Sequence, residues 1–230
     1  AKALASSLGK PLYGVNHVIG HLAVDKLAEG PLPDHFIGLV VSGGHSNILE
    51  VRNIATDVVE LGGTLDDAAG EAFDKVGRLL GLPYPGGPHV DRLSQEGDRE
   101  AIRFPRGLAA GKDKERHKYD FSFSGLKTAV ARYIEGTRDS GEQLRSEDVC
   151  AAFSEAVNDS LTAKAVRAAL DTGCNTIVVG GGFSANSRLR ALLTQRAQAV
   201  GVQVRMPPLR FCTDNGAQIA AIGSELVAAG

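Results

Sequence analysis

The stretch Phe36-Ile37-Gly38-Leu39-Val40-Val41-Ser42-Gly43-Gly44-His45 decides the fold class of this chain. It opens with an uninterrupted apolar run of the length of a buried strand, which Ser42-Gly43-Gly44 then stops. Glycines in such a loop permit positive φ angles, and backbone N–H groups there can point at phosphate oxygens. The pattern therefore predicts a buried strand followed by a loop that contacts phosphate. The simpler alternative is a hairpin turn.

A second glycine loop follows another apolar strand. Residues Thr176–Gly180 predict the strand, and Gly181-Gly182-Phe183-Ser184-Ala185-Asn186 then lead into a helix that runs to about Val200. This order lets a nucleotide approach the backbone, and the helix N-terminus favours anions. The loop is neither a G-x-G-x-x-G nor a Walker motif. Asn186 is expected to cap the helix, or alternatively to hydrogen-bond a ribose or base.

The remaining pattern completes an α/β organisation with no internal repeat. We expect further strands at residues 12–15, 47–52, 58–61 and 202–205. We expect helices at residues 1–9, 16–28, 66–80, 122–134 and 146–170, and a last helix that Asp214-Asn215-Gly216 opens. Residues 84–88, with the sequence Tyr-Pro-Gly-Gly-Pro, are expected to form a rigid loop.

His17 and His21 stand four residues apart in a segment expected to be helical. Side chains at i and i+4 share one helix face, so two imidazoles can bind one ion, with a carboxylate from elsewhere completing the site. Imidazole suits Zn or Fe. The alternative is that two His fell on one face by chance. A zinc protease of the H-E-x-x-H type is excluded because Val18 occupies the position of the general base.

A row of acidic residues and an apparent catalytic motif can both be explained without a functional role. Asp67, Glu71 and Asp74 would share one face of the helix expected at 66–80, as a solvated acidic surface. Alternatively, Asp74 together with the Gly86-Gly87 loop could grip hydroxyl groups of a ligand. The tetrad Ser124-Gly125-Leu126-Lys127 resembles the S-x-x-K of serine acylases, but the S-D-N and K-T-G partners are absent from the sequence. Ser124 is therefore expected to be a helix N-cap.

Composition and charge limit the partners. The chain has 230 residues, 43% of them hydrophobic, which suffices for one large domain or two packed lobes. A net charge of −2 gives no general attraction for nucleic acid. Between Arg99 and Lys127, however, eight Lys and Arg face four acids and four aromatic rings are interspersed. This segment predicts either a solvated face or a contact with a phosphate backbone.

The cysteines and the termini add context. Three widely spaced cysteines, without C-x-x-C, predict no disulfide framework and fit a reducing, cytoplasmic compartment. The sequence has no apolar run of membrane-spanning length and no signal peptide, so we expect no membrane association. The first residues resemble the end of a helix and there is no initiator Met, so we expect that an N-terminal part is missing.

Taken together, these segments resemble the tRNA N6-adenosine threonylcarbamoyltransferase family, called TsaD in bacteria. The matching strings occur in the family's order over almost the whole chain: Asn16–His21, Val41–His45, Asp66–Lys75, Tyr84–Pro88, Phe121–Lys127, Gly180–Asn186 and Cys212–Gly216. The resemblance implies an actin/sugar-kinase/heat-shock-ATPase-like fold with two α/β lobes around a nucleotide cleft, the first lobe being incomplete. Residues 1–35 and 205–230 would then belong to the first lobe, and residues 36–204 mainly to the second.

The resemblance also implies site residues. His17, His21 and Asp214 would hold one divalent metal ion, Fe²⁺ or Zn²⁺, although spacing alone does not join Asp214 to the His pair. Contacts with the substrate, an adenine nucleotide, are implied at Val40, Val41, Ser42, Gly43, Gly44, Asp74, Gly87, Asp91 and Asn186. No residue is identified as the acceptor of the amine proton.

The implied reaction transfers a threonylcarbamoyl group from its adenylate to N6 of adenine 37 in tRNAs that read codons starting with A. The implied partners are tRNA, a shorter TsaB-like paralogue and a small TsaE-like ATPase. One competing hypothesis is a small-molecule kinase or carbamoyltransferase of the same fold, which would not need the basic segment. Another is a non-catalytic partner protein of this fold, which would be expected to lose the metal ligands.

Overall fold

A single mixed sheet organises the computed structural model, which describes residues 1–229. Within these residues the sheet has five strands in the order β3-β2-β1-β4-β5. The strands are β1 (Phe36–Val41), β2 (Ser46–Asn53), β3 (Asp57–Gly63), β4 (Thr176–Gly180) and β5 (Gln203–Arg205). β1 is antiparallel to β2 and parallel to β4. Because β1 and β4 run in the same direction, the two glycine loops that follow them leave the same edge of the sheet.

The central strand β1 is buried on both faces, which explains its uninterrupted apolar run. Ile37, Leu39 and Val41 join the larger hydrophobic core, whereas Phe36 and Val40 join a smaller core on the opposite face. Side chains alternate across a strand, so a strand between two cores needs apolar residues at every position. The predicted strand at this site is confirmed.

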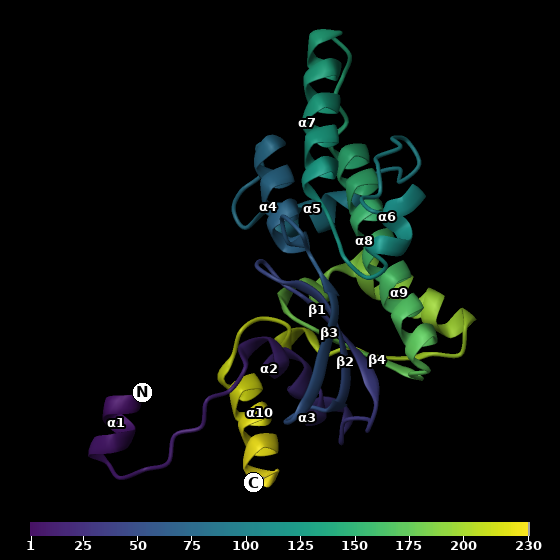
Figure 1. The fold of residues 1–230 in the computed structure, drawn as a ribbon. Helices are drawn as coiled ribbons and strands as arrows, with labels where there is room; N and C mark the ends of the chain where they lie inside the picture. Colours follow the sequence, from purple (N-terminus) through teal and green to yellow (C-terminus); the bar gives the residue numbers. More distant parts are fainter. Residues whose placement is uncertain (230) are drawn as a thin grey trace.

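Helices cover both faces of the sheet (Figure 1). The smaller core is closed by α2 (His17–Ala23) and α10 (Gly216–Ala228), which pack against each other. The larger core is closed by α8 (Ser146–Thr172), with α9 (Ser187–Ala199) packed along it. The other helices are α3 (Lys26–Glu29), α4 (Ala69–Leu79), α5 (Gly86–Ser94), α6 (Gly111–Arg116) and α7 (Ser124–Asp139), and the 3₁₀ turns are η1 (Gly182–Ala185) and η2 (Leu209–Phe211).

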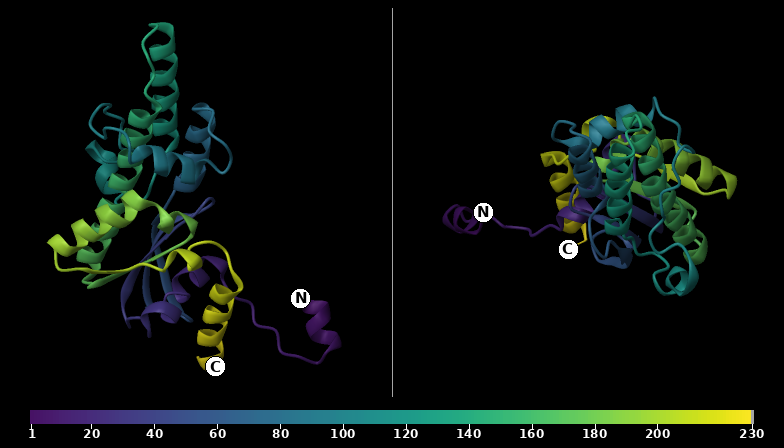
Figure 2. Two further views of the ribbon diagram at one scale, coloured as in Figure 1. Left: turned by 180° about the vertical axis from the view of Figure 1, so that it is seen from behind. Right: turned by 90° about the horizontal axis from the view of Figure 1, so that it is seen from above.

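The first segment of the chain lies apart from the sheet. Helix α1 (Lys2–Ser7) is connected to α2 by an extended stretch, and every view in Figures 1 and 2 shows it away from the other helices. The strand expected at residues 12–15 is wrong, because these residues carry no ladder pairing within the described part of the chain. The helix expected at 16–28 exists, divided into α2 and α3. Among residues 1–229, no helix is both long and apolar enough to cross a membrane.

The segment from Asp66 to Ser94 also differs from the sequence expectation. Helix α4 begins at Ala69, so Asp66 and Asp67 precede it and the predicted three-acid stripe does not form on one helix. The predicted rigid loop at 84–88 is only partly correct, because α5 begins at Gly86. The Gly-Gly-Pro sequence does not indicate α5, because glycine and proline are poor helix formers inside a helix, although they are tolerated in its first turn.

Helix α7 receives its N-terminal cap from a distant residue. The Asp66 carboxylate accepts hydrogen bonds from the backbone N–H of Phe123 at 2.8 Å and of Ser124 at 3.2 Å. The prediction that Ser124 is the N-cap is therefore wrong, since Ser124 is the first residue of α7 and donates its hydroxyl to the same carboxylate. Burial tends to raise the pKa of Asp66, but the hydrogen bonds from Ser122, Phe123 and Ser124 outweigh it and lower the pKa overall.

The packing of helices on the sheet can be compared with the two lobes expected from the sequence. Helices α2 and α10 lie in the segments expected to belong to the first lobe, yet both pack against the sheet formed by residues 36–205. Gly38 in β1 permits this packing, because a Cβ atom there would lie 2.4 Å from a methyl group of Leu22. The lobe boundaries themselves remain a prediction.

Candidate functional site

Two histidines and one carboxylate meet at the junction of α2 and α10. His17 and His21 lie on one face of α2, whose start is fixed by Asn16 accepting a hydrogen bond from Val18 N at 2.9 Å. The Asp214 Oδ1 atom lies 3.5 Å from His17 Nε2 and 3.3 Å from His21 Nε2. One ligand atom from each of the three residues falls within 4.8 Å of the others. The tertiary structure thus joins Asp214 to the His pair, which sequence spacing could not do.

The electrostatics of this cluster suit a cation. His21 is buried, and burial lowers its pKa, as does the neighbouring His17, while Asp214 acts in the opposite direction. A lowered pKa keeps His21 neutral, and neutral imidazole is the form that binds metals. Asp214 is three-quarters exposed, so its second oxygen can turn toward an ion. Two imidazoles and a carboxylate form a donor set that fits zinc or ferrous iron.

The cluster sits directly beside the second glycine loop. A Cβ atom on Gly180, the last residue of β4, would lie 2.5 Å from the backbone oxygen of His21. His45, in the loop after β1, is close enough for its charge to influence the pKa of His21. Both strand ends therefore converge on the candidate metal site.

A cavity of about 410 Å³ opens at the same edge of the sheet. Its wall contains five of the residues singled out from the sequence: Gly43, Asp74, Gly87, Asp91 and Asn186. The other four, Val40, Val41, Ser42 and Gly44, do not line the cavity: Val40 and Val41 are buried in β1, Ser42 is partly buried and Gly44 is exposed. The Ser42 hydroxyl accepts hydrogen bonds from the N–H groups of Gly44 at 3.3 Å and His45 at 3.1 Å. An anion bound by this loop would have to replace the Ser42 hydroxyl as the acceptor for the N–H groups of Gly44 and His45.

Two carboxylates of the cavity wall already hold helix N-termini. Asp74 Oδ1 accepts from Gly86 N at 2.8 Å and from Gly87 N at 3.2 Å, which ties α4 to the start of α5. Asp91 Oδ1 accepts from the backbone N–H of Ser187 at 3.2 Å and from the Ser187 hydroxyl at 2.8 Å, at the start of α9. These bonds satisfy backbone donors that a helix leaves free at its N-terminus. Each aspartate consequently fixes the shape of the cavity, whatever else it contacts.

Asn186 is the polar centre of the cavity floor. It caps α9 by accepting from Leu189 N at 2.9 Å, which confirms the capping interpretation. Its amide nitrogen donates to Asp91 Oδ1 at 2.9 Å, and its oxygen also accepts from Asn158 of α8 at 3.1 Å. The contact of Asn186 with a ribose or base remains a prediction.

Sequence reasoning missed the contribution of α5 to the cavity. Arg92 lies one turn after Pro88 on α5, and Gln95 is the residue that ends this helix. All three line the cavity together with Phe183 of η1. A rigid loop at residues 84–88, as the sequence predicts, gives no helical periodicity that would link Arg92 and Gln95 to Gly87. A proline within the first turn followed by the apolar Val90 and Leu93 is the signal that indicates this helix.

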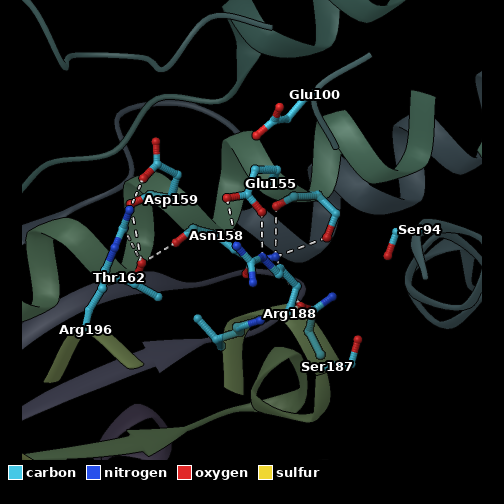
Figure 3. Close-up of polar contacts among 12 residues, drawn as sticks. Ser94, Glu100, Glu155, Asn158, Asp159, Thr162, Ser187, Arg188 and Arg196 are labelled. Carbon is cyan, nitrogen blue, oxygen red and sulfur yellow. Dashed lines mark hydrogen bonds and ion pairs between the residues drawn. The ribbon is translucent and has the colours of Figure 1, made fainter. Parts of the chain in front are cut away.

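A polar network clamps α9 onto α8 (Figure 3). Arg188 donates to Glu155 at 2.9 Å, and Arg196 makes a close ion pair with Asp159, which also pairs with Arg106 at 3.0 Å. Burial tends to raise the pKa of Asp159, but the hydrogen bonds from Arg196 and Arg106 prevail and lower it. The network fixes the helix whose N-terminus carries Asn186.

The basic segment from Arg99 to Lys127 divides into paired and open cations. Arg106, Lys118 and Lys127 form ion pairs with Asp159, Asp171 and Asp67. Within residues 1–229, the other five form no ion pair; they are Arg99, Arg103, Lys112, Lys114 and Arg116. Arg99 and Arg103 also line a second, more polar hollow beside Glu155 and Arg188. Only the open cations are free to neutralise phosphates.

The mixed sheet, its helices on both faces and its paired glycine loops define the class of the chain: an α/β protein with the actin/sugar-kinase/heat-shock-ATPase fold. The whole chain superposes on 39% of the crystal structure of T. kodakarensis HypF, with a TM-score of 0.74 and 16% identity. A full-length HypF in its phosphate- and nucleotide-bound form matches 99% of the chain and 45% of its own, with a TM-score of 0.73 and 17% identity. The ADPNP-bound activator of 2-hydroxyisocaproyl-CoA dehydratase from Clostridium difficile matches 92% of the chain and 68% of its own, with a TM-score of 0.54 and 12% identity.

The chain belongs to the tRNA N6-adenosine threonylcarbamoyltransferase family, TsaD, whose sequence profile matches residues 1–221. It is 56% identical over 228 residues to the tRNA N6-adenosine threonylcarbamoyltransferase of Corynebacterium diphtheriae and 53% identical over 230 residues to that of Bifidobacterium longum. These alignments cover 99% and 100% of the chain. The chain spans 65% and 66% of the length of these two relatives.

Proposed function

We propose that this protein transfers a threonylcarbamoyl group from threonylcarbamoyl-adenylate to N6 of adenine 37 in tRNAs that read codons starting with A. One observation carries the proposal beyond family membership. The loops after two parallel strands, residues of α4 and α5, and Asn186 at the N-terminus of α9 enclose one cavity, at the edge where the His17–His21–Asp214 cluster lies. Ligands of open α/β sheets bind at this kind of edge, outside the carboxyl ends of the strands.

The cavity supports a role for the chain in positioning. The donor is a mixed anhydride with an AMP leaving group, whereas the exocyclic amine of adenine is a weak nucleophile. Rate enhancement must therefore come from holding the two reactants in line and from stabilising negative charge on the donor. A Cβ atom on Gly43 or Gly44 would meet no atom within 4 Å among the described residues, so a phosphate or acyl oxygen can approach this backbone closely. Asn186 and Asp91 line the same cavity and would supply polar contacts.

The metal hypothesis rests on the donor set described above. His17, His21 and Asp214 would hold one Fe²⁺ or Zn²⁺ ion, which acts as a Lewis acid and template for phosphate or carbonyl oxygens when bound. The presence of all three ligands argues against a non-catalytic partner protein, which would be free to lose them.

The tRNA hypothesis rests on the open cations of the basic segment. Arg99, Arg103 and the Lys and Arg of α6 can neutralise backbone phosphates, and a base in an RNA loop can be splayed out without opening a duplex. A small-molecule kinase or carbamoyltransferase of this fold would have no use for such a surface. We further propose a TsaB-like paralogue and a TsaE-like ATPase as partners, and action in the cytoplasm.

The test is nucleoside analysis of tRNA from cells depleted of the protein. Mass spectrometry should show loss of the threonylcarbamoyl modification at adenine 37, restored by the wild-type gene. The variant with His17→Ala and His21→Ala should fail to restore it, while the matched surface variant His35→Ala should succeed, because His35 lies away from the cluster and pairs with Glu50. Unchanged modification after depletion would sink the proposal and favour transfer to a small metabolite.

A further inference from the structure

Gln218 is a buried polar residue that neither the family resemblance nor the proposed mechanism uses. It lies in the first turn of α10, is 1% exposed and packs against α2 at Gly20, the residue that directly precedes His21. Its backbone N–H donates to the Asn215 cap at 3.0 Å, which fixes its position. Its side-chain Nε2 atom lies 3.4 Å from His17 Nδ1. Gln218 therefore contacts the ring nitrogen of His17 that faces away from Asp214.

The amide oxygen of Gln218 poses a physical problem. Oε1 is buried and has no hydrogen-bond partner among the described residues. A buried acceptor without a partner costs about 1–3 kcal/mol. The oxygen and nitrogen of a Gln amide exchange places by a half-turn, and only the surrounding hydrogen bonds decide between the two orientations. In the reversed orientation, Oε1 would face His17 Nδ1.

The two orientations select different tautomers of His17. When the Gln218 NH₂ group donates to Nδ1, the proton of neutral His17 sits on Nε2 and points toward Asp214, 3.5 Å away. When Oε1 faces the ring, it accepts from Nδ1–H, and the lone pair of Nε2 becomes available. A metal-binding histidine usually donates its other ring N–H to an acceptor in just this way, which fixes the ring and raises its basicity.

We propose that Gln218 positions His17 for cation binding, its amide oxygen accepting from His17 Nδ1–H so that Nε2 is free to bind. This inference rests on the proposed metal site and adds a residue to it. Placing Oε1 toward His17 also gives this buried acceptor the hydrogen-bond partner that it otherwise lacks among the described residues. His21 receives no such help, because its Nδ1 atom is buried without a partner among residues 1–229.

The test compares two substitutions of similar length in the purified protein, using zinc alone as the probe. Gln218→Met keeps the shape but removes both hydrogen-bonding groups, so zinc affinity should fall about tenfold, the low end of the usual effect of such outer partners. Gln218→Glu keeps an acceptor, so it should bind zinc at least as tightly as wild type. Gln198→Met, on the exposed face of α9, is the matched control and should change nothing. Affinities come from competition with a fluorescent zinc chelator.

A spectroscopic measurement separates positioning from mere packing. With zinc bound, ¹⁵N spectra of labelled histidine should show the His17 proton on Nδ1, exchanging slowly with water in wild type and faster in Gln218→Met. Wild-type affinity in Gln218→Met, or Gln218→Glu as weak as Gln218→Met, would overturn the inference. A His17 ring without a proton on Nδ1 in the zinc form would overturn it even if a variant failed to fold. If His17→Ala with His21→Ala binds zinc as wild type does, the metal site itself is wrong and both proposals fall.

Discussion

The two glycine loops look alike in the sequence but use their glycines for opposite purposes. In the loop after β1, Cβ atoms on Gly43 and Gly44 would enter open space among the described residues. In the loop after β4, a Cβ atom on Gly181 would lie 2.3 Å from the backbone oxygen of Val41, and Gly181 has a φ of +93°. The first loop is open to a ligand, whereas the second is packed against β1. A glycine cluster in a sequence therefore indicates that another group lies close to the backbone, but it does not indicate whether that group is a ligand or another strand.

The largest effect is expected at Gly181. Replacing it by Ala should destabilise the protein by about 3–5 kcal/mol, because a positive φ is strained for Ala and the Cβ atom would collide with backbone. The adjacent Gly182→Ala is the matched control, since its Cβ atom meets nothing within 4 Å in the described part of the chain. Urea denaturation of both variants measures the difference. Equal stability of the two would remove the distinction between the loops.

The two candidate metal ligands on α2 differ in the same way, since His21 is buried and His17 is half exposed. His17→Ala and His21→Ala should each remove most of the bound metal, since each takes away one of three ligands. Only His21→Ala should also destabilise the metal-free protein, by about 1–3 kcal/mol, because His21 is buried and His17 is half exposed. Elemental analysis and thermal unfolding provide the two readouts. Full metal occupancy in the double variant would place the site elsewhere.

Gly43 tests the open loop. Gly43→Val should weaken binding of the adenylate by about tenfold, equivalent to about 1.4 kcal/mol, because the side chain would fill space reserved for the ligand. Stability should change by less than about 1 kcal/mol, since nothing in the described structure is displaced. Calorimetric titration with a non-hydrolysable adenylate analogue measures the affinity. An unchanged affinity would count against the cavity as the nucleotide site. In Gly181 variants, by contrast, weak binding would report loss of packing.

The basic segment shows the same contrast between open and engaged groups. Charge reversal at Arg103, Lys112 and Lys114 should weaken tRNA binding and reduce the slope of log K against log salt by about 0.9 for each phosphate that the protein no longer neutralises. Arg106→Glu should instead destabilise the protein, because Arg106 pairs with Asp159 inside the α8–α9 network. Affinity measured across a salt series, with the partner proteins present, separates the two. An identical slope in the triple variant would mean that tRNA is held elsewhere.

The smallest effect concerns pH and the engaged group Asp159. Its pKa is lowered in the folded protein, so its ion pairs stabilise the fold fully above the ordinary unfolded pKa of about 3.9. This contribution, about 1 kcal/mol or less for a partly exposed pair, is lost as the pH falls through the lowered folded pKa. Asp159→Asn should therefore flatten the loss of stability below pH 4, relative to wild type, in acid unfolding followed by circular dichroism. An identical acid limb in the variant would contradict the assignment.

Several elements follow from local sequence alone. The apolar run of β1 and the strand–glycine order at β4 are confirmed, because burial on two faces and tight backbone turns leave a direct mark on residue type. The two histidines lie on one face of α2, because helix geometry fixes residues four apart. Asn186 and Asn215 cap α9 and α10, as side chains of this type do at helix starts.

Other elements were misjudged where a distant residue replaced a local one. The cap of α7 comes from Asp66 and not from Ser124, and α5 starts within a Gly-Gly-Pro segment because Asp74 binds its first N–H groups. A local pattern contains no information about such partners. Its periodicity describes one element, whereas these contacts exist only once two elements have packed.

The sequence by itself determined the α/β class, the pair of glycine loops, the imidazole pair and the family, since each is encoded in residues close together or in the order of short strings. Only the tertiary structure decided that Asp214 joins His17 and His21, that Asp74, Asp91 and Asn186 share one cavity, and which cations stay open. The physical reason is the distance along the sequence over which each kind of interaction acts. Strand and helix periodicities act over a few residues, but a binding site forms where the packing of the sheet and its helices brings distant side chains within a few ångströms of each other.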